Sequence, residues 1–385
     1  MIIVKKPKIR FKGFTETWEQ RKLNEICNYH SSSLTAKDSC TDGEYDLFDV
    51  NSLIGKTSSS CIDENYITII KDGAGVGRTR LLPKNTMFLG TMGALTPKGI
   101  DLNFLFQIVS KAELGRFCTG STIPHIYFRD YGENLFFVPS NREQKPIGDY
   151  FSKLDNLITL HQRKCENLKK LKKFMLQKLF PQNGENVPEI RFSNFTDTWE
   201  QRKLGEICSR VQGNDGRMEL PTLTISAANG WMKQEDRFTG NIAGKEQKNY
   251  TLLHKGELSY NHGNSKLAKY GTVFSLQTYE EALVPRVYHS FKVEIGSADF
   301  IEYFFATKMP DRELRKLISS GARMDGLLNI GYDDFMGIKM MFPSVLEQDK
   351  IAEYFRAFDH LITLHQSKCD KLKEVKKYML QNMFI

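Results

Sequence analysis

The chain has 385 residues, more than one hydrophobic core usually serves, which predicts two globular domains plus connecting elements. It is 40% apolar and 26% charged without an apolar run of roughly 18 residues, so the composition indicates a soluble globular protein and argues against a membrane protein. The net charge of +8 suits a partner that carries phosphates. The start MIIVKKPKIRF has no cleavage site of a signal peptide, and the seven cysteines form no C-x-x-C pair. We therefore expect a cytoplasmic protein with free thiols.

The first element in the chain is the segment KIRFKGFTETWEQRKLNEIC, from Lys8 to Cys27. Thr17 and Gln20 have the spacing of a capping box, which predicts a short helix that begins at Trp18. We expect the tryptophan side chain to pack in a core.

A variable segment follows, from about Asn28 to Arg142. It contains β-like runs separated by glycine turns, and one helix is predicted over about 101–112. The runs are YDLFDV, ENYITIIKDGAGVGRTRLL, TMFLGTMGALTP and NLFFVP. This pattern predicts an α+β domain.

The sequence carries no recognisable catalytic machinery. The glycines of residues 73–77 lack the spacing of a dinucleotide-binding turn and precede a strand-like run, which favours a hairpin turn. Residues 55–57 (GKT) resemble the end of a phosphate-binding loop, but Val50 occupies the position of its first glycine. The Asn/Asp-Pro-Pro-Tyr/Phe tetrad of an adenine methyltransferase is missing, and no nuclease-like carboxylate set stands out. We expect a protein that is not an enzyme and binds no metal.

A long helix is predicted next, from Glu143 to Phe180. Its apolar residues recur at spacings of four and three, with a mean near 3.5, which is typical of a coiled-coil seam. Ser140 and Glu143 form a second capping-box pattern after a proline. At about 1.5 Å per residue the helix is roughly 60 Å long.

The second half of the chain repeats these elements. EIRFSNFTDTWEQRKLGEIC, from Glu189 to Cys208, repeats the first segment, and residues 347–384 repeat the long helix. The variable segment between them, about 209–346, shares little with the first and carries the runs PTLTIS, ELSYN, GTVFSL and RVYHSFKVEI, with one helix over 297–316. Similar frames around dissimilar segments indicate one repeated structural purpose and two distinct functions. The alternative is drift after an old duplication.

The two long helices should pair, because each buried Leu, Ile or Phe contributes about 1.5 to 3 kcal/mol. A pseudo-twofold relation favours an antiparallel coiled coil with the variable domains at opposite ends, whereas parallel pairing would place both at one end. The predicted seam comprises Phe151, Leu154, Ile158, His161, Phe355, Phe358, Ile362 and His365. The histidines, and Lys172 and Lys376 further along the seam, are interpreted as polar residues that set the register, with a metal or switch role as the alternative.

The predicted fold is therefore α+β, with two globular α+β recognition domains separated by two long helices in an antiparallel coiled coil and related by a pseudo-twofold internal repeat. The predicted boundaries are residues 1–142 for domain 1, 143–182 for the first helical spacer, 183–346 for domain 2 with a linker at 183–188, and 347–385 for the second spacer.

Two copies of TWEQRKLxEIC and of a helix containing LITLHQxKC make the whole chain resemble the specificity subunits of type I restriction-modification systems. The resemblance implies that the variable domains each read one half of a split, asymmetric DNA site and that the helices set the gap. It also implies that the repeated parts dock two methyltransferase subunits, which supply S-adenosylmethionine and methylate adenine at N6. Restriction subunits add ATP- and Mg-dependent cleavage, so this chain should bind none of these cofactors.

Candidate DNA contacts are polar, basic and aromatic residues in the predicted loops. They are Arg78, Arg80, Ser121, Thr122, His125, Tyr127, Asn229, Trp231, Lys233, Tyr260, Asn261, His262, Asn264, Lys266 and Arg323. A surface or turn role is the alternative for each. For the whole chain, the alternative is a non-catalytic coiled-coil scaffold with two protein-binding domains.

Overall fold

The computed structural model describes residues 6–120, 123–182, 184–238, 244–263, 265–318 and 327–385. It divides into two compact units, Met1–Arg163 with His365–Ile385, and Lys164–Leu364. Each unit thus contains one variable segment and a part of each long helix. Within the described residues, no helix is both long and apolar enough to cross a membrane.

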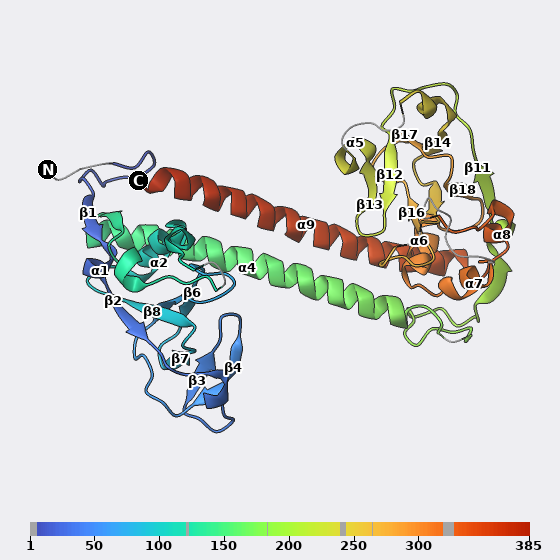
Figure 1. The fold of residues 1–385 in the computed structure, drawn as a ribbon. Coiled ribbons are helices and arrows are strands. Elements are labelled where there is room, and N and C mark those ends of the chain that lie inside the picture. The colour runs from blue at the N-terminus through green and yellow to red at the C-terminus, as the bar shows by residue number, and fades with distance from the viewer. Residues whose placement is uncertain (1–5, 121–122, 183, 239–243, 264, 319–326) are drawn as a thin grey trace. The chain divides into compact units, whose positions relative to one another are not determined.

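The first unit contains an antiparallel four-stranded sheet (Figure 1). Its strands, in spatial order, are β2 (Cys27–Ser31), β8 (Met92–Pro97), β5 (Tyr66–Ile70) and β6 (Thr79–Leu82). A smaller sheet contains β4 (Leu53–Thr57), β3 (Tyr45–Phe48) and β7 (Thr86–Phe88), with β3 and β7 parallel. The helices are α1 (Leu23–Ile26), α2 (Leu102–Lys111) and α3 (Phe128–Tyr131). The Asp101 carboxylate caps α2 by accepting from the Phe104 amide.

The second unit contains a four-stranded sheet of the same antiparallel order. Its strands are β11 (Cys208–Val211), β18 (His289–Val293), β15 (Leu258–Asn261) and β16 (Thr272–Ser275). Two smaller pairs differ from the first unit: β12 (Leu223–Ser226) with β13 (Gly230–Lys233), and β14 (Thr251–His254) with β17 (Glu281–Val284). The variable segments therefore share a central sheet that their sequences do not reveal, and they differ in what is added to it.

The helices of the second unit depart from one prediction. They are α5 (Gln234–Arg237), α6 (Ala298–Ala306), α7 (Asp311–Lys316) and α8 (Tyr332–Met336). The single helix expected over 297–316 is wrong, because the chain breaks between α6 and α7. Lys308 adopts a positive φ of 65°, and Pro310 has no amide hydrogen to continue the helix.

The repeated tryptophan segments form strands, so the short helices predicted at Trp18 and Trp199 are wrong. Strand β1 (Glu19–Lys22) pairs with β9 (Leu135–Val138), and β10 (Glu200–Lys203) pairs with β19 (Lys339–Phe342). In both cases the partner strand is distant in sequence and directly precedes a long helix. Both indole rings are buried, as expected. Pairing with a distant strand outweighs the local capping pattern.

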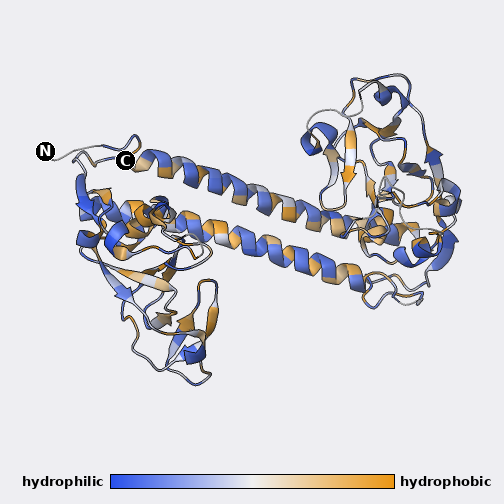
Figure 2. Cartoon of the chain, viewed as in Figure 1, coloured by the Kyte–Doolittle hydropathy of each residue, from blue (hydrophilic) through white to orange (hydrophobic). Residues whose placement is uncertain are grey.

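The long helices are α4 (Asn141–Lys178) and α9 (Val345–Met383), and they pack antiparallel. In the first unit, Asp155 contacts Lys376 and His161 contacts His365, so rising numbers on α4 meet falling numbers on α9. In the second unit, Lys172 contacts Asp359. Figure 2 shows hydrophobic residues distributed among hydrophilic ones along both helices. The antiparallel pairing and the α+β class are thereby confirmed.

Most predicted seam residues are withdrawn from solvent. Phe151 and Phe355 are fully buried. Leu154, Ile158 and Phe358 are also buried, whereas Ile362, His161 and His365 are half-buried. The Nδ1 atoms of the two histidines lie 2.9 Å apart. The seam is thus apolar with a polar layer at the histidines.

Each unit has the same aromatic core around its tryptophan. In the first unit, Trp18 packs edge-on against Phe104 of α2 and Phe384, which follows α9. In the second, Trp199 packs against Phe300 of α6 and Phe180, which follows α4. The end of each long helix therefore contributes to the core around the tryptophan of the other repeat. Phe384, after α9, packs with Trp18, and Phe180, after α4, packs with Trp199.

Candidate nucleic-acid interface

In the first unit, the turn between β5 and β6 is a glycine loop. Gly73, Gly75 and Gly77 all have positive φ, and the Gly77 amide donates to the Ile70 carbonyl at 2.9 Å. A Cβ on Gly77 would lie 2.5 Å from the Gly115 nitrogen, so only glycine fits there. The predicted hairpin turn is confirmed by the antiparallel pairing of β5 with β6.

A second loop, between the 3-10 turn Leu114–Phe117 and α3, is joined to this hairpin. The Gly73 amide donates to the Pro124 carbonyl at 2.9 Å, and the Ile126 amide donates to Lys71 at 3.0 Å. The Asp72 carboxylate bonds Nδ1 of His125. We call the described residues of these two loops, 71–78, 119–120 and 123–127, the first reading loops.

The predicted residues of this region occupy different environments. His125 is half-buried and its ring lies 4.0 Å from that of Tyr127, which is exposed. Arg78 is exposed, and its Nη2 donates to the Val50 carbonyl at 2.8 Å. Arg80 is half-buried over the Phe48 ring, 5.1 Å from its centroid. Ser121 and Thr122 lie outside the described residues.

The second unit joins the topologically equivalent loops. The turn from β15 to β16 meets the segment before α8, where the Leu328 amide donates to the His262 carbonyl at 2.8 Å. The ring nitrogens of His262 lie 2.7 Å from the Leu328 oxygen and 2.9 Å from the Val287 oxygen. We call the described residues 261–263, 265–271 and 327–330 the second reading loops.

Two predicted contacts in this unit need correction. Tyr260 is fully buried, and its hydroxyl donates to the Tyr270 carbonyl at 2.7 Å. His262 is also buried and is occupied by backbone carbonyls. Both residues hold the loops in place and cannot reach a base in this conformation. Lys266 is exposed, Asn261 is half-buried, and Asn264 and Arg323 lie outside the described residues.

His289, on β18, contacts the second reading loops and holds them in place. Its Nε2 lies 2.9 Å from the Ile330 carbonyl, and its ring stacks on that of His262. Burial lowers the pKa of His289 to about 4. The imidazole is therefore neutral near pH 7 and donates one hydrogen bond to the segment before α8.

The other predicted residues of the second unit lie at the turn between β12 and β13 and on strand β13 itself. Asn229 is exposed at the turn. Trp231 is half-buried, and its indole nitrogen donates to the Ser275 carbonyl at 3.0 Å. Lys233 is exposed and pairs with Glu235 at 3.1 Å. Asn229 and Lys233 are available to a ligand, whereas Trp231 mainly supports the sheet.

Sequence reasoning missed one residue of the first reading loops and one residue next to them, in α3. Asp72 holds His125, and the exposed Arg129 lies over the Tyr127 ring, 4.7 Å from its centroid. The signal for Arg129 was its place two residues after Tyr127, at the start of α3. The pairing of Asp72 with His125 joins residues far apart in sequence and left no local signal.

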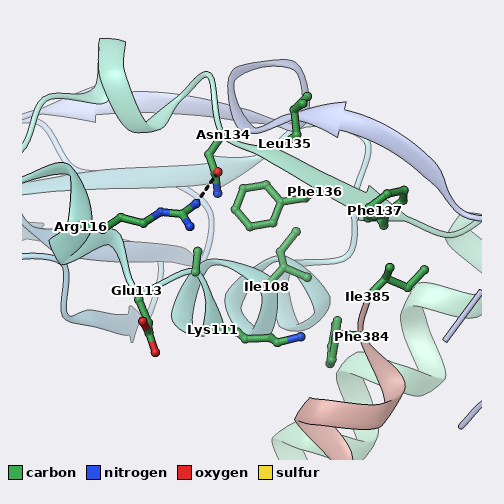
Figure 3. Close-up of a pocket in the computed structure, with 11 residues that line it drawn as sticks. Ile108, Lys111, Glu113, Arg116, Asn134, Leu135, Phe136, Phe137, Phe384 and Ile385 are labelled. Atoms are coloured by element: carbon green, nitrogen blue, oxygen red, sulfur yellow. Dashed lines mark hydrogen bonds between the residues drawn. The ribbon is translucent and has the colours of Figure 1, made fainter. Parts of the chain in front are cut away.

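A cavity of about 220 Å³ lies in the first unit (Figure 3). Figure 3 shows α2, strand β9 and the end of α9 around it. Arg116 donates to the Asn134 side-chain oxygen at 2.6 Å, and Lys111 lies over the Phe384 ring. Burial lowers the pKa of Lys111. Its lining includes Ile108, Lys111, Arg116, Phe136, Phe384 and Ile385.

The second unit has a cavity of about 300 Å³ at the equivalent place, after α6 and beside β19. Its lining includes Phe304, Lys308, Arg312, Lys339 and Met340. Both cavities combine apolar and basic side chains with one glutamate, Glu113 in the first and Glu313 in the second. Among the residues that the structure describes, no group of three His, Cys, Asp or Glu side chains could hold a metal ion.

Comparison with known proteins agrees with this architecture. The family model of the type I restriction modification DNA specificity domain matches residues 15–170. The chain is similar to the type I restriction enzyme MjaVIII specificity subunit of Methanocaldococcus jannaschii, with 23% identity over 83% of this chain and 78% of that protein.

The fold is similar to that of a solved structure, the type I restriction-modification system S subunit from M. genitalium. The TM-score is 0.69, with 16% sequence identity, and the match covers 99% of both chains. Residues 15–170 thus match the DNA specificity domain of type I restriction-modification systems, and the whole chain is similar to specificity subunits of these systems in sequence and in fold.

Proposed function

We propose that this chain reads a bipartite, asymmetric site on double-stranded DNA, with one half-site for each pair of reading loops. The observation that carries this proposal is the repetition of one frame around two unlike sets of loops. The four-stranded sheets have the same order, yet the strands and side chains added to them differ. Two different readers on equivalent frames suit a site whose halves differ in sequence.

The chemistry of the exposed loop residues supports base and phosphate contacts. Arg78 and Tyr127 in the first unit, and Asn229, Lys233 and Lys266 in the second, are exposed. Arginine and asparagine can make bidentate contacts to bases, each discriminating by about 1 to 3 kcal/mol, while lysine more often contacts phosphate. A few such contacts in each domain suffice for a specific half-site.

We further propose that the repeated frame docks two methyltransferase subunits. Each long helix carries an exposed apolar row that its partner helix does not cover. On α4 the row is Leu157, Leu160, Leu171 and Phe174, and on α9 it is Leu361, Leu364, Val375 and Tyr378. The rows occupy equivalent positions in the repeat. Each consists of two pairs of apolar residues that lie two heptads apart, which suits the apolar face of another helix.

The two apolar and basic cavities would serve the same partners. They recur at equivalent places in the frame, and their basic residues suit an acidic segment of a partner. In this proposal the methyltransferase subunits bring S-adenosylmethionine for methylation of adenine at N6. Restriction subunits join through the complex with ATP and Mg, and this chain binds no cofactor. The complex acts in the cytoplasm, with the DNA.

The main alternative is a scaffold whose two domains bind proteins. To decide between them, the chain is purified with a methyltransferase partner and used to select from a random pool of duplex DNA. We expect enrichment of one motif with two defined halves and a spacer of constant length. Enrichment of no such motif would favour the scaffold.

Exchange of the second variable segment tests whether the halves are read independently. Residues 209–346 are replaced by the equivalent segment of another specificity subunit, and methylated adenines are mapped by modified-base sequencing. We expect one half-site to change and the other to persist. A change in both halves would contradict one reader for each half-site.

A further inference from the structure

Each unit contains a group of three polar residues, here called a triad, where one helix of its variable segment meets both long helices. In the first unit, Lys376 of α9 donates to Asp155 of α4 at 2.6 Å, and Asp155 also accepts from Gln107 of α2 at 3.3 Å. Gln107 is buried, and the ion pair is only partly exposed. The triad thus ties a recognition domain to both long helices at one point.

The second unit repeats this arrangement with equivalent residues. Lys172 of α4 donates to both carboxylate oxygens of Asp359 of α9, at 2.5 and 2.7 Å. The hydroxyl of Tyr303, on α6, donates to Asp359 at 2.8 Å. Burial and the nearby Asp359 carboxylate raise the pKa of Tyr303, which keeps its hydroxyl protonated as a donor.

A shift of one heptad between the helices would destroy both triads. Such a shift keeps apolar residues of the seam opposite one another, so within the seam the polar positions discriminate most strongly against it. The burial of Phe180 and Phe384 in the two unit cores adds to this discrimination. After the shift, Lys376 would lie opposite Gly148 or Gln162, and Lys172 would also lose its acidic partner. Each lysine would then lie on a partly buried seam without a carboxylate, which is unfavourable.

We infer that the two triads set the register of α4 against α9 and the position of each recognition domain on these helices. They thereby help to determine the spacer length, which is the number of base pairs between the two half-sites, although they contact no base. Gln107, Asp155 and Lys376 form the first triad, and Tyr303, Asp359 and Lys172 form the second. The spacer consequence rests on the proposed function, whereas the register consequence depends on the protein alone.

The first triad offers the cleaner test because the Gln107 amide can donate to a carboxylate at position 155 or accept from a lysine there. Three variants are compared with the wild type: Lys376→Asp, the exchange Lys376→Asp with Asp155→Lys, and the control Lys377→Asp. Lys377 is exposed on the same turn of α9. Lys376→Met is added, since it removes the charge and keeps the aliphatic volume.

Thermal unfolding is the readout that needs no DNA. We expect Lys376→Asp to lower Tm by at least about 2 to 4 °C, because two carboxylates then face each other. The double exchange should restore most of this shift, and Lys377→Asp should leave Tm unchanged. Equal Tm values for Lys376→Asp and Lys377→Asp, or no recovery in the exchange, would overturn the register role.

Spacer preference is the second readout, measured with the methyltransferase complex on duplexes that keep both half-sites and vary the gap. We expect Lys376→Asp and Lys376→Met to reduce methylation at the wild-type gap at least tenfold relative to other gaps. The remainder should spread to gaps up to about three base pairs away, because one heptad is about 10.5 Å. Unchanged gap preference alongside a lowered Tm would reject the spacer role. A wild type without any bipartite preference would reject the proposed function instead.

Discussion

At the scale of single residues, two repeated ion pairs hold the tryptophan segments against the long helices. Arg10 donates to both carboxylate oxygens of Glu143, and Arg191 does the same to Glu347 at 2.7 Å. The capping-box pattern predicted that Glu143 caps its own helix, and Glu347 occupies the equivalent position of the repeat. The structure instead uses them as nearly inaccessible acceptors for an arginine distant in sequence.

Removal of one glutamate charge should therefore destabilise its unit. Only 1% of the Glu347 side chain and 13% of the Arg191 side chain are exposed. We expect Glu347→Gln to lower the free energy of unfolding by about 3 kcal/mol, because the buried guanidinium loses its charged partner. Denaturant unfolding measures the change. Glu353→Gln, on the exposed side of the same helix, should stay within about 0.5 kcal/mol of the wild type, and a similar loss in both variants would contradict the role of burial.

His289 should make the second unit sensitive to mild acid. Its pKa falls from an ordinary 6.5 to about 4 in the folded chain, so the unfolded chain binds the proton more tightly. The resulting stabilisation is complete above pH 6.5 and is lost as the pH falls from there towards 4, with about 2 kcal/mol lost by about pH 5. The largest loss of stability that this shift of the His289 pKa can cause is roughly 3 kcal/mol.

Two variants measure this contribution by denaturant unfolding at about pH 7.5 and about pH 5. His289→Gln keeps a donor for the Ile330 carbonyl but cannot titrate, so its stability should fall less between the two conditions. His360→Gln, at an exposed site on α9, should behave like the wild type. Identical pH dependence in the wild type and His289→Gln would refute the effect of His289.

At the scale of elements, the long helices have an inner seam that stabilises the chain and an outer row that we assign to partners. Phe151 and Phe355 lie in the seam and contact the aromatic cores of their units. Leu157 and Leu361 are exposed and occupy equivalent positions of the repeat. The two classes of position should therefore respond differently to mutation.

The outer row should affect assembly more than stability. We expect Leu157→Asn with Leu361→Asn to weaken association with the methyltransferase by about tenfold or more, since two apolar contacts of about 1 kcal/mol or more are lost. The free energy of unfolding of the isolated chain should change by less than about 1 kcal/mol. Analytical ultracentrifugation measures the assembly. Unimpaired assembly of this variant would exclude the row as a docking surface.

At the scale of the whole molecule, the internal repeat requires that the two long helices, α4 and α9, have matching lengths. Each unit's core is completed by the end of the other half's helix, through Phe384 in one and Phe180 in the other. A change in one helix alone would displace one of these phenylalanines. A change in both helices together preserves the two cores and alters only the separation between recognition domains.

Insertion of one heptad into both α4 and α9 next to His161 and His365 should therefore shift the DNA spacer. A heptad adds about 10.5 Å, so we expect a gap longer by about three base pairs with unchanged half-sites. Modified-base sequencing of DNA from cells with the variant complex gives the result. A changed half-site, or an unchanged gap, would contradict the role of the helices in spacing.

The amino-acid sequence by itself determined the elements that depend on local or periodic signals. The repeat, the long helices, their seam and the glycine hairpin all follow from residue spacing, because a helix face or a tight turn is specified by residues close together in the chain. The resemblance to the specificity subunits rested on the same repeated segments. The loops that carry the candidate DNA contacts were also recognisable, as polar stretches between strands.

Only the tertiary structure decided what depends on contacts between distant residues. It revealed the common sheet of the two variable segments, the pairing of β1 with β9, the burial of Tyr260 and His262, and the bonds from Asp72 to His125 and from Arg10 to Glu143. Strand pairing and burial are set by partners far away in the sequence, and no local pattern encodes them. For the same reason the triads at Asp155 and Asp359 emerged only when three separate helices were placed together.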